Sequence, residues 1–238
     1  MSRSRWGSQF DHHRQTRRRG CRLVCPRKLR ISGSGGACGP VPAIAGSGGS
    51  GGRGKGGPVS GVDVDFAGVS RTLPAVPLPS GIRVAYLKLY GDVELTEHCA
   101  SILAGEMRSD VEVLLVGESG GILLGHVIAR RLGLPYVLAR KKWRPNMEHP
   151  LRQFVRSIGT DGDQVLLVDD EDQVLLAGKR VAIVDEVISS GATLGAMRAL
   201  ACSANATVSQ VLAVATEGDH RDDVVALAHL PLFSDGVR

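Results

Sequence analysis

Two adjacent carboxylates stand at the end of a short apolar run and precede a turn of small polar residues. Asp185 and Glu186 come directly after Val181–Val184, and the turn leads into apolar residues at helical spacing. Carboxylates accept hydrogen bonds from vicinal hydroxyls, and free N–H groups at a helix N-terminus bind phosphate. The pattern predicts a sugar-phosphate site, with an ordinary strand end and a capped helix as the alternative. The expected phosphate-binding residues are Ser189, Ser190, Gly191, Ala192 and Thr193.

A second segment repeats this order of an apolar strand, a turn of small residues and a helix. Leu115–Gly117 leads into Glu118, Ser119 and Gly120, and apolar residues at helical spacing follow. On its own this turn also fits a tight connection that uses glycine for a positive φ angle. Together the two turns predict a pair of anion sites at one edge of a parallel sheet, where the carboxyl ends of the strands meet. A substrate with two separated phosphate groups needs this arrangement.

Basic residues follow a third apolar run. Arg140 and Lys141 come directly after Tyr136–Ala139, and two further cations stand at positions 142 and 144. A run of charges can be an ordinary solvated surface, but this one follows a strand expected to end at the same edge. Cations there would neutralise a diphosphate, so Arg140 and Lys141 join the predicted substrate site.

The spacing of apolar residues predicts the elements that must position these groups. Helices are expected where apolar residues recur every three or four positions, and strands where short apolar runs end in turn residues. Alternating strands and helices of this length indicate an α/β fold with a doubly wound, mostly parallel sheet. The expected strands are 82–89, 111–116, 136–139, 181–184 and 208–215, and the expected helices span 95–107, 123–132 and 194–201.

An acidic stretch, Asp169–Asp172, lies between two short apolar runs. Val165–Val168 and Val174–Leu176 flank it, so we predict a β-hairpin with a solvated turn rather than a metal site. The histidines show no paired spacing suited to zinc, and no chemistry is assigned to them.

The net charge of the chain changes sign at about residue 60, from basic before it to acidic after it. Residues 1–60 hold twelve Lys or Arg and one acid, and twelve glycines fall within residues 31–58. Such a segment buries too little apolar surface to offset its chain entropy, so we predict a disordered basic tail. Residues 61–238 form the predicted domain, and their seventeen basic and twenty-three acidic residues give a net charge of −6. The high isoelectric point therefore comes from the tail, and no nucleic-acid partner is expected.

Cysteine spacing and hydropathy limit the cellular environments in which the protein is expected to act. The cysteines at positions 21, 25, 38, 99 and 202 match neither a disulfide framework nor a zinc finger. Reduced thiols in a cytoplasmic protein are the simpler interpretation. No apolar run reaches the roughly eighteen residues of a membrane span, so no membrane partner is expected.

A P-loop NTPase is a rival interpretation of the same strand. Val181–Glu186 also fits a Walker B strand, and Gly49–Gly56 nearly spells a Walker A loop. Gly56 stands where Ser or Thr should hold Mg²⁺, and neither a strand nor an apolar helix flanks the loop. The context that this motif requires is missing.

Residues 181–194 resemble the phosphoribosyl-diphosphate-binding signature of type I phosphoribosyltransferases. The segment from Gly117 to Lys142 is similar to the adenine-specific branch, in which a Glu-Ser-x-Gly turn precedes a helix and a strand ending in Arg-Lys, and Leu230–Phe233 resembles the tail of some purine-type members. The resemblance covers roughly residues 80–238. It implies a small hood element beside the sheet. It also implies transfer of a phosphoribosyl group to a purine base in purine salvage, with adenine as the expected base and a homodimer as the expected assembly.

The resemblance also implies a role for each predicted site residue. Asp185 and Glu186 would be the catalytic residues that bind the ribose hydroxyls, and residues 189–193 would bind the 5′-phosphate. Mg²⁺ would bind mainly through substrate oxygens, with Asp185 as the candidate protein ligand. The family often has a non-proline cis peptide in the diphosphate turn. Its diphosphate-binding residues would be Ser119, Gly120, Arg140 and Lys141.

Three positions depart from the family pattern. Glu186 stands where the family usually has Asp, and Gly120 stands where adenine-specific members commonly have Arg. The mobile loop of those members carries a Tyr-Glu-Tyr-Gly-like stretch, whereas this chain reads Ser157-Ile158-Gly159-Thr160. The sequence therefore leaves a second function open, a transcriptional regulator of the same fold that binds phosphoribosyl diphosphate and catalyses nothing.

Overall fold

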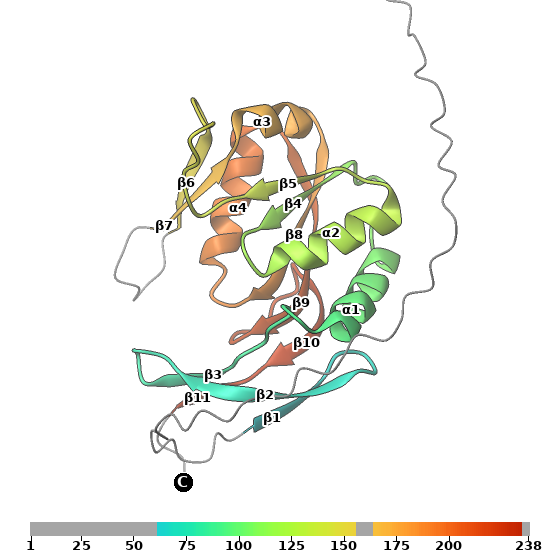
Figure 1. The fold of residues 1–238 in the computed structure, drawn as a ribbon, viewed down its shortest axis with the longest axis vertical. Helices are drawn as coiled ribbons and strands as arrows, with labels where there is room; N and C mark the ends of the chain where they lie inside the picture. Colours follow the sequence, from blue (N-terminus) through green and yellow to red (C-terminus); the bar gives the residue numbers. More distant parts are fainter. Residues whose placement is uncertain (1–60, 156–163, 235–238) are drawn as a thin grey trace, which may run out of the picture. The chain divides into compact units, whose positions relative to one another are not determined.

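Five parallel strands form the central sheet, in the order β10-β9-β8-β4-β5 (Figure 1). The computed structural model describes residues 61–155 and 164–234 of the chain. The predicted mostly parallel sheet is confirmed, since each pair of neighbouring strands in it is parallel. The strands are β4 (Val113–Gly117), β5 (Tyr136–Ala139), β8 (Arg180–Ile188), β9 (Thr207–Glu217) and β10 (Val225–Leu230).

The strand order reverses between β4 and β8. Counted along the chain, the central strands run 2-1-3-4-5 across the sheet, and Val116 of β4 pairs with Val184 of β8. Open α/β sheets bind ligands at such a switch point, beyond the carboxyl ends of the strands. Both predicted anion-binding turns follow these two strands.

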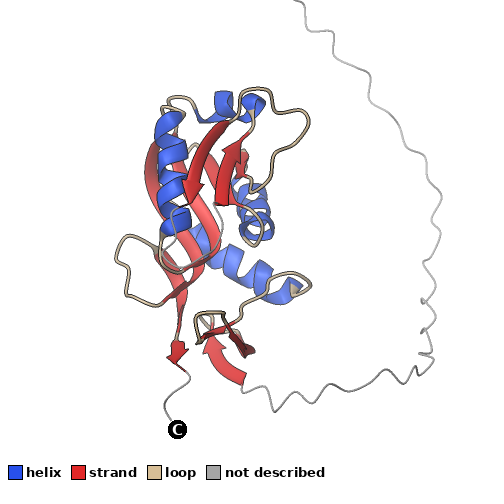
Figure 2. Cartoon of the chain, turned by 90° about the vertical axis from the view of Figure 1, so that its left-hand side faces the viewer, coloured by secondary structure: helices blue, strands red, loops and turns tan. Residues whose placement is uncertain are grey.

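Helices cover both faces of the sheet (Figure 2). Leu114 and Val116 of β4 pack with α1 and α2, whereas their neighbours Val113 and Leu115 pack with α3 and α4. Successive strand residues point to opposite faces, so an unbroken apolar run indicates a strand buried on both sides. The doubly wound architecture follows from this pattern. The helices are α1 (Val93–Gly105), α2 (Gly121–Leu132), α3 (Asp170–Leu176) and α4 (Ala192–Ser203).

A second, antiparallel sheet joins both ends of the described chain, in the order β1-β2-β3-β11. It corresponds to the hood element that the resemblance implies. The strand predicted at 82–89 ends at Ala85, and residues 86–92 lead to α1 without strand structure. The sequence analysis did not predict the first two strands. The four are β1 (Gly61–Asp65), β2 (Ser70–Pro77), β3 (Ile82–Ala85) and β11 (Leu232–Ser234).

The β-hairpin predicted around Asp169–Asp172 is wrong. β7 (Gln164–Val168) pairs with β6 (Leu151–Val155), and the acidic stretch forms the first turn of α3. Carboxylates in the first turn stabilise a helix through its dipole, and Leu176 at the end of α3 is fully buried. A helix thus places the acids at its favourable N-terminus and also buries Leu176, whereas a hairpin explains only the acids as a solvated turn.

Some predictions fall on residues that the structure does not describe. These are the tail at 1–60 with its three cysteines and the near-Walker loop, and Ser157–Thr160. Within the described residues, Cys99 and Cys202 are free thiols. None of the described helices is long and apolar enough to cross a membrane.

Candidate functional site

The ends of β4 and β8 bring the acid pair against the first glycine turn. A β-carbon placed on Gly117 would lie 2.9 Å from Oδ2 of Asp185. One placed on Gly121 would lie 3.0 Å from the carbonyl oxygen of Val184. Glycine at these positions lets the turn approach β8 more closely than any other residue would allow. Two segments 68 positions apart in sequence therefore form one site.

Burial changes the electrostatics of both acids. Asp185 is half-buried, and loss of water raises its pKa to about 6. The backbone N–H of Glu186, which donates to Oδ1 of Asp185 at 2.8 Å, and the charge of Lys141 oppose this rise in pKa. Burial also raises the pKa of Glu186, and the backbone N–H of Leu89 opposes it. Asp185 is thus ionised at neutral pH in a partly dehydrated place, where its charge acts strongly.

The diphosphate turn contains a cis peptide bond between Glu118 and Ser119, as the resemblance implied. The Glu118 N–H donates to the carbonyl of Ala139 at 3.0 Å, and the Glu118 carboxylate accepts from the Lys141 N–H. These bonds attach the turn to the end of β5. Gly120 then begins α2.

The second turn follows β8 and ends in the helix α4. Gly191 begins this helix with φ of +79°, a left-handed conformation that glycine adopts without strain. Asp185 and residues 187–194 line a small cavity of about 100 Å³ at this turn. The predicted phosphate-binding residues Ser189, Ser190, Gly191, Ala192 and Thr193 all contribute to its wall.

The helices that begin at the site differ from α1 at their N-termini. Asp92 caps α1 and Glu94 lies in its first turn, so its free amides and its dipole are satisfied within the chain. In the described structure, the N-cap glycines of α2 and α4 have no side chain that caps the helix, and neither first turn holds an acid. At α4 the Ala192 N–H has only a long contact of 3.5 Å to Oγ of Ser190. Their amide donors are therefore available to an anionic ligand.

The two basic residues after β5 lie on different sides. The charge of Lys141 acts on Asp185, whereas the charge of Arg140 opposes the rise in the pKa of Asp172 that burial causes. Alternation along an extended chain explains the difference. The backbone of Arg140 bonds to Leu167 in both directions at 2.8 Å, and its Nε is buried without a hydrogen-bond partner among the described residues. Lys141 is therefore the basic residue of the two whose charge acts on Asp185.

Two residues of the site, one at the end of β9 and one beyond it, were not predicted from the sequence. Nη1 of Arg221 lies 2.5 Å from where a β-carbon on Gly191 would be, and Asp223 holds the guanidinium at 3.0 and 3.1 Å. Glu217 shares a cavity of about 600 Å³ with Ser189, and burial raises its pKa. Both come after the strand that was correctly predicted at 208–215. Because this strand was expected to end at the same sheet edge as the other two, its following residues could have been predicted as part of the site.

The residues at this edge suit a magnesium ion that is held with a substrate. No group of three His, Cys, Asp or Glu side chains within residues 61–155 and 164–234 lies close enough to hold a metal alone. Asp185 and Glu186 offer carboxylate oxygens, the ligands that Mg²⁺ prefers, and Mg²⁺ commonly uses one or two carboxylates with substrate phosphates. The donor set therefore fits the ion.

A parallel sheet with an acid pair and two uncapped helix N-termini at its switch point defines a protein that binds a phosphorylated, hydroxyl-bearing ligand. Residues 93–224 match the phosphoribosyl transferase domain family. The chain belongs to this family.

Curated relatives and solved structures agree with this assignment. The adenine phosphoribosyltransferase of Corynebacterium kroppenstedtii is 32% identical over 173 residues, which cover 72% of this chain and 92% of that protein. That of Mycobacteroides abscessus is 30% identical over 167 residues, 70% of this chain and 90% of that protein. A crystal structure of adenine phosphoribosyltransferase from Thermoanaerobacter pseudethanolicus has the same fold, with a TM-score of 0.57 at 23% identity over 66% of this chain and 95% of that one.

Proposed function

We propose that the protein is a purine-salvage enzyme that transfers the 5-phosphoribosyl group from phosphoribosyl diphosphate to adenine, which yields AMP and diphosphate. One observation carries the proposal: the Asp185 carboxylate lies where two uncapped helix N-termini meet at the β4/β8 switch point. Family membership and the similarity to adenine phosphoribosyltransferases support the reaction and the base.

Each part of the substrate has a matching part of the site. Asp185 faces the ribose, as Glu186 was also predicted to do, and the loop at 189–193 binds the 5′-phosphate with Arg221 beside it. Ser119 and Gly120 present backbone N–H groups to the diphosphate, and Arg140 and Lys141 were predicted to assist. Of the two, Lys141 is the one whose charge acts on Asp185, so it is the cation that we assign to the diphosphate.

Positioning and electrostatics account for catalysis. The purine nitrogen forms its bond to C1 as the C1–O bond to diphosphate breaks, and the proton of the nitrogen passes to the departing diphosphate. Positive charge develops on the ribose during this step, and the ionised Asp185 stabilises it in a partly dehydrated site. The two anion sites hold the phosphate groups at either end of the ribose, which aligns C1 with the base.

Mg²⁺ would supply charge neutralisation for the departing diphosphate, with Asp185 as the protein group placed to contact it. A homodimer and a domain boundary near residue 60 belong to the same proposal. A cytoplasmic location stays a prediction from the sequence.

A panel of bases tests the proposal directly. The protein is incubated with Mg²⁺, phosphoribosyl diphosphate and adenine, guanine, hypoxanthine, xanthine or orotate, and nucleotide formation is followed by chromatography. We expect AMP from adenine and little product from the other bases. Binding of phosphoribosyl diphosphate without turnover of any base would instead support the regulator, and the absence of binding would contradict both functions.

A further inference from the structure

Gly120 stands in a backbone conformation that does not require glycine. Its φ of −60° and ψ of −38° are ordinary right-handed values that any residue adopts. Space is the constraint, because a β-carbon on Gly120 would overlap Oε2 of Glu186. Glycine is therefore needed here because of the side chain at position 186.

The other oxygen of the Glu186 carboxylate is also engaged. Its Oε1 accepts a hydrogen bond of 2.8 Å from the backbone N–H of Leu89, which lies 97 residues earlier in the chain. Leu89 is 1% exposed and belongs to the segment 86–92 between β3 and α1. An aspartate at position 186 would be shorter by about one carbon–carbon bond, ~1.5 Å, and would fall short of this donor.

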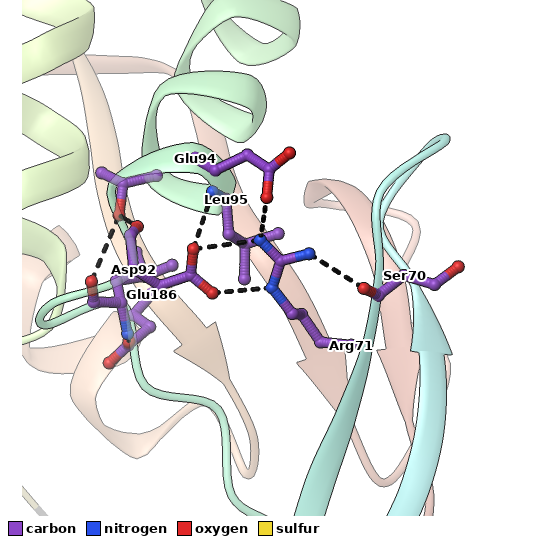
Figure 3. A network of polar contacts seen from close by, with 8 residues as sticks. Ser70, Arg71, Asp92, Glu94, Leu95 and Glu186 are labelled. Carbon is purple, nitrogen blue, oxygen red and sulfur yellow. Dashed lines mark hydrogen bonds and ion pairs between the residues drawn. The ribbon is translucent and has the colours of Figure 1, made fainter.

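A chain of polar contacts links Leu89 to the small sheet. Figure 3 shows the part of it around Arg71 and Asp92. The Leu89 carbonyl accepts from Oγ1 of Thr96 at 3.3 Å, and the same hydroxyl donates to the carbonyl of Asp92 at 2.7 Å. The Asp92 carboxylate caps Leu95 and pairs with Arg71 of β2 at 2.7 and 3.1 Å. Hydrogen bonds thus run from β2 through the start of α1 to the acid pair.

We propose that Glu186 is a positioning residue, which holds Leu89 and the segment 86–92 against the diphosphate turn and needs glycine at position 120 for its carboxylate. The two adjacent acids then have different tasks, since Asp185 faces the ribose and Glu186 joins the small sheet to the turn. The turn carries no cation at position 120, so the diphosphate is neutralised by Lys141. This last step rests on the proposed function, whereas the contact between Glu186, Gly120 and Leu89 does not.

A double-mutant cycle on the full chain without ligands tests the contact. Gly120→Ala should lower the midpoint of thermal unfolding by about 3–6 °C, because the methyl group displaces Glu186. The double variant Gly120→Ala/Glu186→Asp should regain part of that loss, because the shorter acid removes the overlap with Oε2 and leaves only the 2.8 Å approach of the Cβ of residue 186. Gly195→Ala is the matched control, since a β-carbon there meets nothing within 4 Å. Additive shifts in the cycle would overturn the proposal.

Hydrogen exchange and kinetics test the positioning role. The Leu89 amide should exchange at least tenfold faster in Glu186→Ala than in the wild type, and Glu186→Gln should restore protection because its amide oxygen accepts the same bond. Glu186→Ala should also raise KM for phosphoribosyl diphosphate about tenfold with a smaller fall in kcat, and Gln should recover most of that loss. If Gln is as impaired as Ala in both measurements, the charge of Glu186 matters and the proposal is wrong.

The two proposals fail in different ways. If the wild-type protein converts no base, the proposed function fails, but the unfolding cycle and the exchange of the Leu89 amide still report on Glu186. If AMP forms but the cycle is additive and the Leu89 amide is unaffected, only the positioning role fails.

Discussion

The carboxylate of Asp185 fills the space that a side chain on Gly117 would need, with Oδ2 2.9 Å from where a β-carbon would be. No other side chain fits at position 117 unless this acid moves. The contact joins the proposed ribose-binding and diphosphate-binding parts of the site at the ends of β8 and β4.

Asp185→Asn should lower kcat by about a hundredfold or more, because the neutral amide cannot stabilise positive charge on the ribose. The backbone pairing of residue 185 with Ala213 of β9 does not depend on the side chain, so the fold should persist. Steady-state AMP formation and circular dichroism measure the two effects. Wild-type turnover by the variant would refute the role of Asp185.

The pH dependence of stability should report the burial of Asp185. Its pKa rises from 3.8 to about 6 on folding, so the folded state binds more protons than the unfolded state between these values. The contribution to stability is present below pH 3.8 and is lost as the pH rises through about 6.

Relative to the wild type, Asp185→Asn should therefore become more stable as the pH rises from about 4 to 7, by on the order of 1–3 kcal/mol. Urea unfolding of both proteins without Mg²⁺ or substrate measures this difference. A constant difference across the pH range would show that Asp185 titrates normally.

Arg221→Ala should raise KM for phosphoribosyl diphosphate about tenfold, because the guanidinium beside Gly191 adds a charge-assisted donor at the 5′-phosphate. Arg198→Ala is the matched control. Arg198 pairs with the same carboxylate, Asp223, at 3.1 Å, but the structure does not place it against Gly191. Equal effects of the two substitutions would mean that Arg221 acts only through its ion pair.

Lys141→Met should also raise KM for phosphoribosyl diphosphate about tenfold, since it removes the cation beside Asp185 while keeping most of the side-chain volume. The pKa of Asp185 should rise further in this variant, because the charge of Lys141 holds it down. Lys142→Met, at the exposed next position, should change KM less than threefold. Isothermal titration with phosphoribosyl diphosphate provides a second measurement. Similar losses from both lysines would indicate a general effect of surface charge.

Local patterns predicted four of the five strands of the central sheet and three of the four described helices, but missed β10 and α3. Val181–Val184 and Leu194–Ala201 have the periodicity of a buried strand and an amphipathic helix, and both lie within β8 and α4. The prediction for the acidic stretch at 169–172 was wrong because two short apolar runs on either side of such a stretch fit a hairpin turn and the start of a helix equally well. The helix that forms there depends on the burial of Leu176, which is a tertiary contact.

The sequence by itself determined that two small-residue turns and an acid pair stand at strand ends, because apolar periodicity and turn chemistry are local properties. Only the tertiary structure decided which side chains meet there. It brought the carboxylate of Asp185 to Gly117 and Arg221 to Gly191, and it placed Glu186 between Gly120 and Leu89. These contacts join segments up to 97 residues apart, and they depend on the strand order and on space around glycines, which no local pattern encodes.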